Sequence, residues 1–476
     1  MEGNPNILAW IALVLCVPVS MFMIARWRAA VSVPLVIVGG QMFLPSNLGW
    51  EVPHLMYVNK DVLVPLGALL GCYFFRRSSI ARARPFRGYD LFLVLRLVTL
   101  LGSCMTNQEA LVFPKGTVPG LSFASYVGNA LAIFLYWWPT IFLGRTVIKT
   151  SRDLKTLFVI FAGAATVYTF FVLIELRMSP QLNMWIYGYR QTPFVMTLRA
   201  GGFRPMAFMR HGLNLAFFLS VCVCAATALG RVKGRVFGIK ARYIALYLMV
   251  VLIFDHSLGA LLYAALGMPL IWVASARTQT RVAAVLALLA FCYPLARATG
   301  LVPVKEINAF VLEKFGQDRA GSLGLRLNEE EYIMTRTLER PWFGWGPGGR
   351  SFRLDPVTGE NRSVTDGLWA LVFGSDGVLG YALYFGMLFY PVWRSRRALK
   401  QLPTKQDQTF VAALAVIGAI YIVELIPNSS IDPYITFLTA VLAGVVGRGL
   451  QPDEDAVPAP SEARDDWPAE APRRYA

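Results

Sequence analysis

Residues 206–229 read MAFMRHGLNLAFFLSVCVCAATAL. Arg210 and His211, near the start, are the basic residues of this run, and it contains no acidic residue. As a helix, such a run is long enough to cross a hydrocarbon core of about 30 Å. Similar runs recur along the chain, and only 16% of the 476 residues are charged, whereas soluble domains carry about 25%. The sequence therefore predicts an all-α polytopic membrane protein. It excludes a soluble globular enzyme, a fibrous protein and a disordered chain.

We predict about thirteen transmembrane helices, within a range of eleven to fourteen because the second, third and eighth apolar runs are short. The expected spans are 7–25, 29–44, 61–75, 89–105, 121–144, 155–176, 206–229, 241–255, 257–275, 281–301, 366–392, 408–427 and 434–449. Around them we expect five segments. These are an N-terminal transmembrane bundle (1–176), central transmembrane helices with an interfacial outer loop (177–301), a long extracytoplasmic loop that carries short helices (302–365), C-terminal transmembrane helices (366–450) and a disordered cytoplasmic tail (451–476).

Basic residues gather in alternate connections between these spans, as in the group that begins at Arg76 and ends at Arg87. Cytoplasmic loops of membrane proteins carry an excess of Lys and Arg, so this alternation places the N-terminus and the 302–365 loop outside. It also accounts for the formal net charge of +16. A nucleic-acid partner is therefore not expected. A loop of this length between spans usually carries function.

Polar residues concentrate at the predicted outer ends of the spans, among them Asn107, Glu109, Asp255 and Asp366. Because charged groups within a membrane are costly, we interpret the set as a polar cavity that opens outward beneath the long loop. Any single one of them is also explained as an interfacial residue. The 177–205 connection carries four arginines and no acid, which indicates either a polyanionic ligand or an anchor to lipid headgroups.

Within the loop, Asn328 followed by three glutamates predicts a helix start, and Pro341 predicts its end. On this helix Arg336 and Arg340 share one face, as two guanidinium forks suited to phosphate oxygens or as one side of a solvated salt-bridged surface. The glycine-rich turn that follows, residues 341–350, permits close approach of backbone N–H groups to an anion, and its aromatic residues can stack on a sugar. No metal-binding motif is found on the predicted extracytoplasmic side, so we expect no metal and no cofactor.

Four groups of residues together resemble the O-antigen ligase and O-antigen polymerase superfamily over about residues 200–390. They are Asp318-Arg319 with Arg326, Arg340-Pro341 and Phe343-Gly344-Trp345-Gly346; Val364-Thr365-Asp366-Gly367-Leu368-Trp369; Gly377-Val378-Leu379-Gly380; and, upstream, Arg204-Pro205, Phe208-Met209-Arg210-His211-Gly212 and His256-Ser257-Leu258-Gly259. The first 200 residues are similar in topology only.

The resemblance implies a metal-independent, inverting glycosyltransferase of the GT-C type in a bacterial inner membrane. Such an enzyme moves glycan from an undecaprenyl diphosphate-linked donor onto a glycan or lipid-linked acceptor at the periplasmic face, alongside membrane lipids and other polysaccharide-assembly proteins. Family members use loop arginines for the diphosphate and a loop histidine as the candidate base. The 302–365 loop contains no histidine, which favours a polymerase or divergent transferase over a strict lipopolysaccharide ligase.

Asp366 occupies the neighbourhood of the missing histidine, and the candidate proton acceptors are Asp366, Glu330 and His211 in that order. Asp366 is also explained as a helix N-cap. The expected donor- and glycan-binding residues are Arg319, Arg326, Arg336, Arg340, Arg210, Arg204, His256 and Trp345. Two other function classes stay open: a lipid-linked glycan transporter, and a non-catalytic scaffold subunit of an envelope polysaccharide complex.

Overall fold

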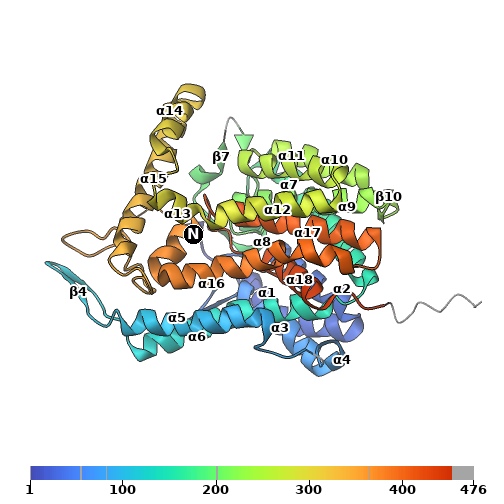
Figure 1. The fold of residues 1–476 in the computed structure, drawn as a ribbon, viewed down its shortest axis with the longest axis horizontal. Coiled ribbons are helices and arrows are strands. Elements are labelled where there is room, and N and C mark those ends of the chain that lie inside the picture. The colour runs from blue at the N-terminus through green and yellow to red at the C-terminus, as the bar shows by residue number, and fades with distance from the viewer. Residues whose placement is uncertain (1, 54–55, 82, 200–201, 364, 453–476) are drawn as a thin grey trace, which may run out of the picture.

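The computed structural model describes residues 2–53, 56–81, 83–199, 202–363 and 365–452, with the backbone alone for residues 2, 199, 315, 318, 319 and 322. Most of this part of the chain is helical, and its strands are short and paired in twos. The long helices run side by side along one direction, with connections at both ends of the bundle (Figure 1). The all-α class of a membrane-embedded protein is confirmed at this level.

Seven helices in the described part are long and apolar enough to cross a membrane. They are α1 (Ile7–Arg26), α5 (Leu91–Met105, preceded by the 3-10 turn η1, Gly88–Asp90), α6 (Phe123–Val147), α7 (Ser151–Met178), α9 (Gly212–Arg231), α16 (Leu368–Ala398, followed by η3, Leu399–Gln401) and α17 (Lys405–Glu424). Four shorter apolar helices accompany them: α2 (Ala29–Phe43), α10 (Ala241–Phe254), α11 (Leu258–Val273) and α18 (Pro433–Arg448).

The other helices are α3 (Lys60–Phe75), α4 (Arg77–Ile80), α8 (Leu182–Tyr187), η2 (Phe194–Thr197), α12 (Ala276–Phe291), α13 (Tyr293–Ala298), α14 (Val304–Phe315) and α15 (Gln317–Leu338). The strand pairs are β1 (Glu2–Gly3) with β6 (Tyr189–Arg190), β2 (Gly49–Val52) with β3 (Met56–Asn59), β4 (Leu111–Phe113) with β5 (Gly116–Val118), β7 (Leu198–Arg199) with β8 (Gly202–Phe203), and β9 (Arg235–Val236) with β10 (Ile239–Lys240). All five pairs are antiparallel.

Each of the thirteen expected spans contains a helix, although the number of helices that cross a membrane stays a prediction. The seventh begins later than expected. Residues 206–211 are a loop whose Met206 and Ala207 N–H groups donate to the Glu175 carboxylate at 2.8 and 2.7 Å, and His211 caps α9 by accepting from the Leu213 N–H. The tenth is interrupted: α12 ends at Phe291, and Pro294 lies in the first turn of α13, where a missing N–H is tolerated.

The core of the bundle is built around α9, which is buried along almost its whole length. It packs against α7, α10, α11 and α17, while α16 packs against α5, α12 and α17, and α18 packs against α6. The loop helices α14 and α15 and the β4 hairpin lie at one end of the bundle, and α4 and β10 lie at the other (Figure 1). The long loop and the basic connections around α4 and β10 therefore occupy opposite ends.

The predicted loop helix is longer than expected and starts elsewhere. Asn328 lies inside α15, which begins at Gln317 after Gly316, whose φ of 84° separates it from α14. Leu327 and Ile333 are buried where α15 packs on α16. This packing outweighs the capping signal at Asn328, because most helix stability in proteins comes from tertiary contacts. Residues 453–476, most of the predicted tail, lie outside the described residues.

Candidate functional site

Helix α16 is broken in its N-terminal third, at Gly377, which has φ 66° and ψ −167°. Only glycine adopts such angles at low cost. The break removes helical partners from backbone groups on both of its sides. Before the break, the carbonyls of Gly374 and Ser375 accept from the Trp345 and Gly346 N–H groups at 2.9 and 2.8 Å.

After the break, the turn formed by residues 341–346 supplies the acceptors. The Val378 N–H donates to the Pro341 carbonyl at 2.8 Å, and the Leu379 N–H donates to the Trp342 carbonyl at 3.3 Å. The turn and the helix therefore complete each other's backbone hydrogen bonding. Within a membrane, non-helical backbone is tolerated only where protein or water satisfies it in this way. The glycine-rich turn thus has a structural role that its composition alone did not reveal.

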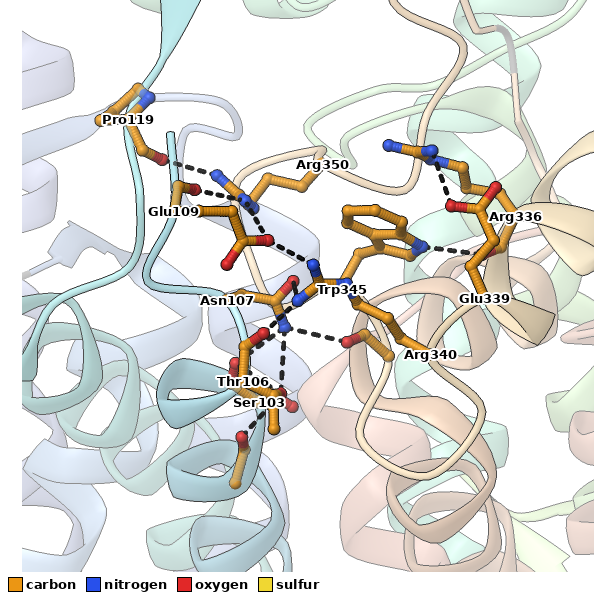
Figure 2. A network of polar contacts seen from close by, with 12 residues as sticks. Ser103, Thr106, Asn107, Glu109, Pro119, Arg336, Glu339, Arg340, Trp345 and Arg350 are labelled. Atoms are coloured by element: carbon orange, nitrogen blue, oxygen red, sulfur yellow. Dashed lines mark hydrogen bonds and ion pairs between the residues drawn. The ribbon is translucent and has the colours of Figure 1, made fainter. Parts of the chain in front are cut away.

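Glycine is required on both sides of this contact. A Cβ at Gly344 would lie 2.6 Å from the Gly377 nitrogen, and a Cβ at Gly377 would lie 2.6 Å from the Gly344 nitrogen. The end of α5 holds the other side of the turn, because the Ser103 hydroxyl donates to the Phe343 carbonyl and the Asn107 amide donates to the Gly344 carbonyl at 3.0 Å. The polar residues that close the fourth predicted span therefore meet the long loop, as Figure 2 shows.

Arg336 and Arg340 lie against the same indole ring, in agreement with their predicted common face. Their guanidinium carbons lie 3.7 and 4.4 Å from the centroid of the Trp345 ring. The Trp345 indole N–H donates to the Arg336 carbonyl at 2.7 Å, and Arg336 pairs with Glu339 at 2.9 Å. Trp345 is only 4% exposed, so it supports the two cations instead of offering an open ring face to a sugar.

Arg340 and Arg350 hold the loop onto the segment that follows α5 (Figure 2). Arg340 donates to the Asn107 side chain at 3.0 Å and also pairs with Glu109. Arg350 is 1% exposed, and it donates to the Pro119 and Glu109 carbonyls, both at 2.8 Å. A hydrogen bond from its own backbone, and then the charges of Arg340 and Arg350, hold the pKa of the Glu109 carboxyl below its ordinary value. Arg350 was not among the predicted binding residues.

A pocket of about 120 Å³ lies between α15, the start of α16 and the turn that follows α17. Three residues chosen from the sequence line it: Arg326, Glu330 and Asp366. Arg326 pairs with Asp366 at 2.8 Å, and both side chains are 42% exposed. Gly367, not Asp366, is the N-cap residue of α16, so the start of this helix has no side-chain cap. Asp366 therefore serves as an ion-pair partner of the loop helix in this structure.

Glu330 is the buried carboxyl group of this pocket, 7% exposed. It accepts hydrogen bonds from the Tyr293 hydroxyl and the Trp369 indole, both at 3.2 Å, and its oxygen lies 3.8 Å from Nε of Arg297. Burial raises the pKa of Glu330 above its ordinary value, and the hydrogen bond from Trp369 and the charge of Arg297 oppose this increase. Tyr293, Arg297 and Trp369 were not predicted as partners of Glu330. Arg297 could have been found, because it is a cation inside the expected span 281–301 and such residues usually have a partner.

The remaining predicted residues occupy other polar contacts. Arg210 pairs with Asp61 at 2.6 Å and interacts electrostatically with Asp432. The turn from α17 to α18 links this group to the pocket, since its Pro427 lines the pocket and its last residue is Asp432. Arg204 donates to the His256 carbonyl at 3.4 Å, and the side chain of Arg319 lies outside the described part of the structure.

The site therefore has two parts, the pocket of Arg326 and the arginine pair on Trp345. Arg326 and Arg336 belong to α15, and Arg340 follows shortly after its end. Ten positions separate Arg326 from Arg336, which corresponds to about 15 Å along α15. In the described residues, no group of three or more His, Cys, Asp or Glu side chains is arranged to hold a metal ion. No model of a known protein family matches the chain, and no curated protein matches it.

Proposed function

We propose that the protein is a glycosyltransferase that moves or polymerises glycan from an undecaprenyl diphosphate-linked donor onto an acceptor sugar. The observation that carries this proposal is the pocket in which Arg326, Glu330 and Asp366 meet. These residue types were selected from the sequence for binding phosphate and accepting a proton. Glycan transfer needs both abilities within reach of one sugar.

The pocket's charges suit the two halves of the reaction. Departure of a diphosphate leaves negative charge on its oxygens, and the planar fork of Arg326 can bind two of them at once. The acceptor hydroxyl must lose a proton, and a carboxylate beside it contributes typically 10²–10⁴-fold to the rate. Asp366 is proposed for this role because it is the more exposed carboxylate and is already oriented by Arg326.

Donor binding has a defined consequence for the ion pair. Arg326 has five N–H donors, and the diphosphate competes with Asp366 for them. We propose that this competition releases Asp366 toward the acceptor hydroxyl when the donor is in place. Glu330, buried with its pKa raised, is the second proton acceptor, or orients the acceptor through Tyr293 and Trp369.

Arg336 is assigned a different part of the donor. It lies about 15 Å from Arg326 along α15, and it is 24% exposed beside Trp345. We propose that Arg336 contacts the glycan beyond the reacting sugar, whereas Arg340 and Arg350 keep the loop in place. The proposal includes a GT-C-like fold, a bacterial inner membrane, a periplasmic long loop, and other polysaccharide-assembly proteins as partners.

Transport of the lipid-linked glycan is the alternative function suggested by the break in α16, because secondary transporters bind substrate at the free ends of discontinuous helices. Here the carbonyls of Gly374 and Ser375 and the N–H groups of Val378 and Leu379 bond to the 341–346 turn. These backbone groups are engaged by protein and are not presented to a substrate. The arrangement therefore favours a fixed site over a moving gate.

The test is reconstitution of the purified protein in liposomes with a lipid diphosphate glycan and an acceptor glycan. We expect free lipid diphosphate and a longer glycan to appear together. Arg326→Lys keeps the charge but loses the fork, so it should slow this release at least tenfold. Arg362→Lys, a loop arginine paired with Asp355 outside the pocket, is the matched control. Movement of the donor across the bilayer without release would contradict the proposal and support a transporter. If neither release nor movement occurs, the result would contradict the proposal and support a scaffold.

A further inference from the structure

A second cavity, of about 650 Å³, lies at the end of the bundle opposite the long loop. Its lining residues come from the end of α9, the β9–β10 hairpin, the start of α10 and the last turn of α11. Its volume falls within the range typical of small-molecule and headgroup sites, about 300–1,000 Å³. Nothing in the proposed transfer reaction uses this cavity.

The lining of this cavity is strongly basic. Its cations are Arg231, Lys233, Arg235, Lys240 and Arg242, and its lining residues include no acid. Arg231 has a structural role, because its guanidinium donates to the Ile271 and Ala274 carbonyls at the end of α11. The other four cations have no ion-pair partner among the described residues. All four are exposed, and Arg235 and Arg242 donate only to neutral groups, the Gly238 carbonyl and the Tyr243 hydroxyl. Four like charges gathered around one cavity attract an anion.

The cavity is shaped by a fixed backbone. The hairpin turn has positive φ at both central residues, 51° at Phe237 and 78° at Gly238, as in the tight turns that match the strand twist. Val236 is 2% exposed and lies against Gly163 of α7, which anchors the hairpin to the bundle. Among the lining residues, a Cβ at Gly230 would lie 2.9 Å from the Arg242 backbone nitrogen and 3.1 Å from the Trp272 ring, so the helix ends approach closely here.

The surroundings identify the source of the anion. Large apolar side chains are exposed on the hairpin and on the adjoining helix ends, among them Phe237 (68%), Ile239 (51%), Trp272 (42%) and Val273 (78%). Aromatic and apolar residues beside Lys and Arg are typical of the membrane–water interface. Basic pockets at the ends of transmembrane helices bind acidic lipid headgroups.

We propose that this cavity binds the phosphate-bearing headgroup of an anionic membrane lipid. Phosphodiester oxygens accept from the four cations, while the acyl chains lie along the exposed apolar surface beside Trp272 and Val273. A soluble phosphate compound shares the headgroup's chemistry but gains nothing from that apolar surface. The inference concerns the basic end of the bundle and is independent of the proposed transfer.

The experiment measures lipid binding to the purified full-length protein by native mass spectrometry, with phosphatidylglycerol, cardiolipin and phosphatidylcholine in turn. We expect saturable binding of one anionic lipid with at least tenfold preference over phosphatidylcholine, and no competition from millimolar inorganic phosphate. Equal binding of all three lipids by the parent protein would overturn the proposal. Loss of binding in inorganic phosphate would also overturn it, and would indicate a soluble anion.

A charge-matched pair of variants locates the site. The cavity variant replaces four cations and spares Arg231: Lys233→Gln, Arg235→Gln, Lys240→Gln and Arg242→Gln. The control replaces four cations near the end of α16: Arg394→Gln, Arg396→Gln, Arg397→Gln and Lys400→Gln. Each cation near an anionic membrane surface contributes roughly fivefold in affinity, so the cavity variant should lose the preference and the control should keep it. Equal losses in both would overturn the site. Lys240→Gln alone, at an exposed position, should weaken binding about fivefold if the quadruple variant does not fold.

Discussion

Replacing Gly377 by alanine tests the closure of α16 by the 341–346 turn. Alanine at φ 66° and ψ −167° costs of order 1–3 kcal/mol in backbone strain. The new Cβ would also lie 2.6 Å from the Gly344 nitrogen and from the Trp342 carbonyl group, and both are backbone atoms that cannot rotate away. The four backbone hydrogen bonds across this contact contribute about 0.5–1.5 kcal/mol each. We expect Gly377→Ala to weaken docking of the turn by about 3 kcal/mol.

The assay is amide hydrogen exchange, read at Trp345, Gly346, Val378 and Leu379. A loss of about 3 kcal/mol corresponds to roughly a hundredfold loss of protection, since 1.4 kcal/mol is a factor of ten. Gly386→Ala is the matched control in the same helix, because its Cβ would meet only Phe92 at 3.4 Å, and alanine is about 0.5–1 kcal/mol better than glycine inside a helix. Equal protection of the turn in the two variants would refute the role of Gly377.

Three further outcomes are expected. Arg96 and Asp376 form a largely buried ion pair at 3.1 Å. Removing one partner should destabilise the protein by about 3–5 kcal/mol, and replacing both by apolar residues should cost less. Additive losses in a double-mutant cycle would contradict the pairing. Burial raises the pKa of Glu330 in the folded protein above its value in the unfolded chain. The stability that protonated Glu330 contributes is therefore complete below the pKa of the unfolded state and is lost as the pH rises through the pKa of the folded state. Glu330→Gln should flatten the pH dependence of thermal unfolding between these two values, and an unchanged curve would refute the assignment. A cysteine at Val357, which is 43% exposed, should react with an impermeant thiol reagent in spheroplasts, whereas one at Arg397 should react only after permeabilisation; the reverse pattern would invert the proposed orientation.

The helices were predictable because an apolar run of sufficient length has few alternatives in a membrane. Their exact starts were less predictable, because they depend on particular tertiary bonds. Glu175 binds the 206–207 backbone and delays the start of α9, and no feature of the local sequence indicates that contact. Asn328 carried a capping signal, yet it lies within α15.

The grouping of the candidate site was predictable only in part. Arg326, Glu330 and Asp366 do meet in one pocket. The break at Gly377 was not predictable, since Gly374 and Gly380 lie in the same run and nothing in the sequence marks which glycine leaves helical geometry. Its partner turn is also more than thirty residues away in the sequence. Arg350 was overlooked because its bonds go to backbone carbonyls, which the sequence does not mark.

The most direct measurement is the transfer rate of Asp366→Asn in liposomes that contain donor and acceptor glycans. Asparagine has nearly the same size but cannot accept the proton. Asp355→Asn is the control, because Asp355 lies in the same loop outside the pocket and accepts from the Val357 and Thr358 N–H groups, which asparagine can also do. We predict that Asp366→Asn binds the donor and lowers release of lipid diphosphate by 10²-fold or more, while Asp355→Asn stays within about threefold of the parent. Near-parental release by Asp366→Asn would contradict its role as the proton acceptor and leave it as an ion-pair partner of Arg326.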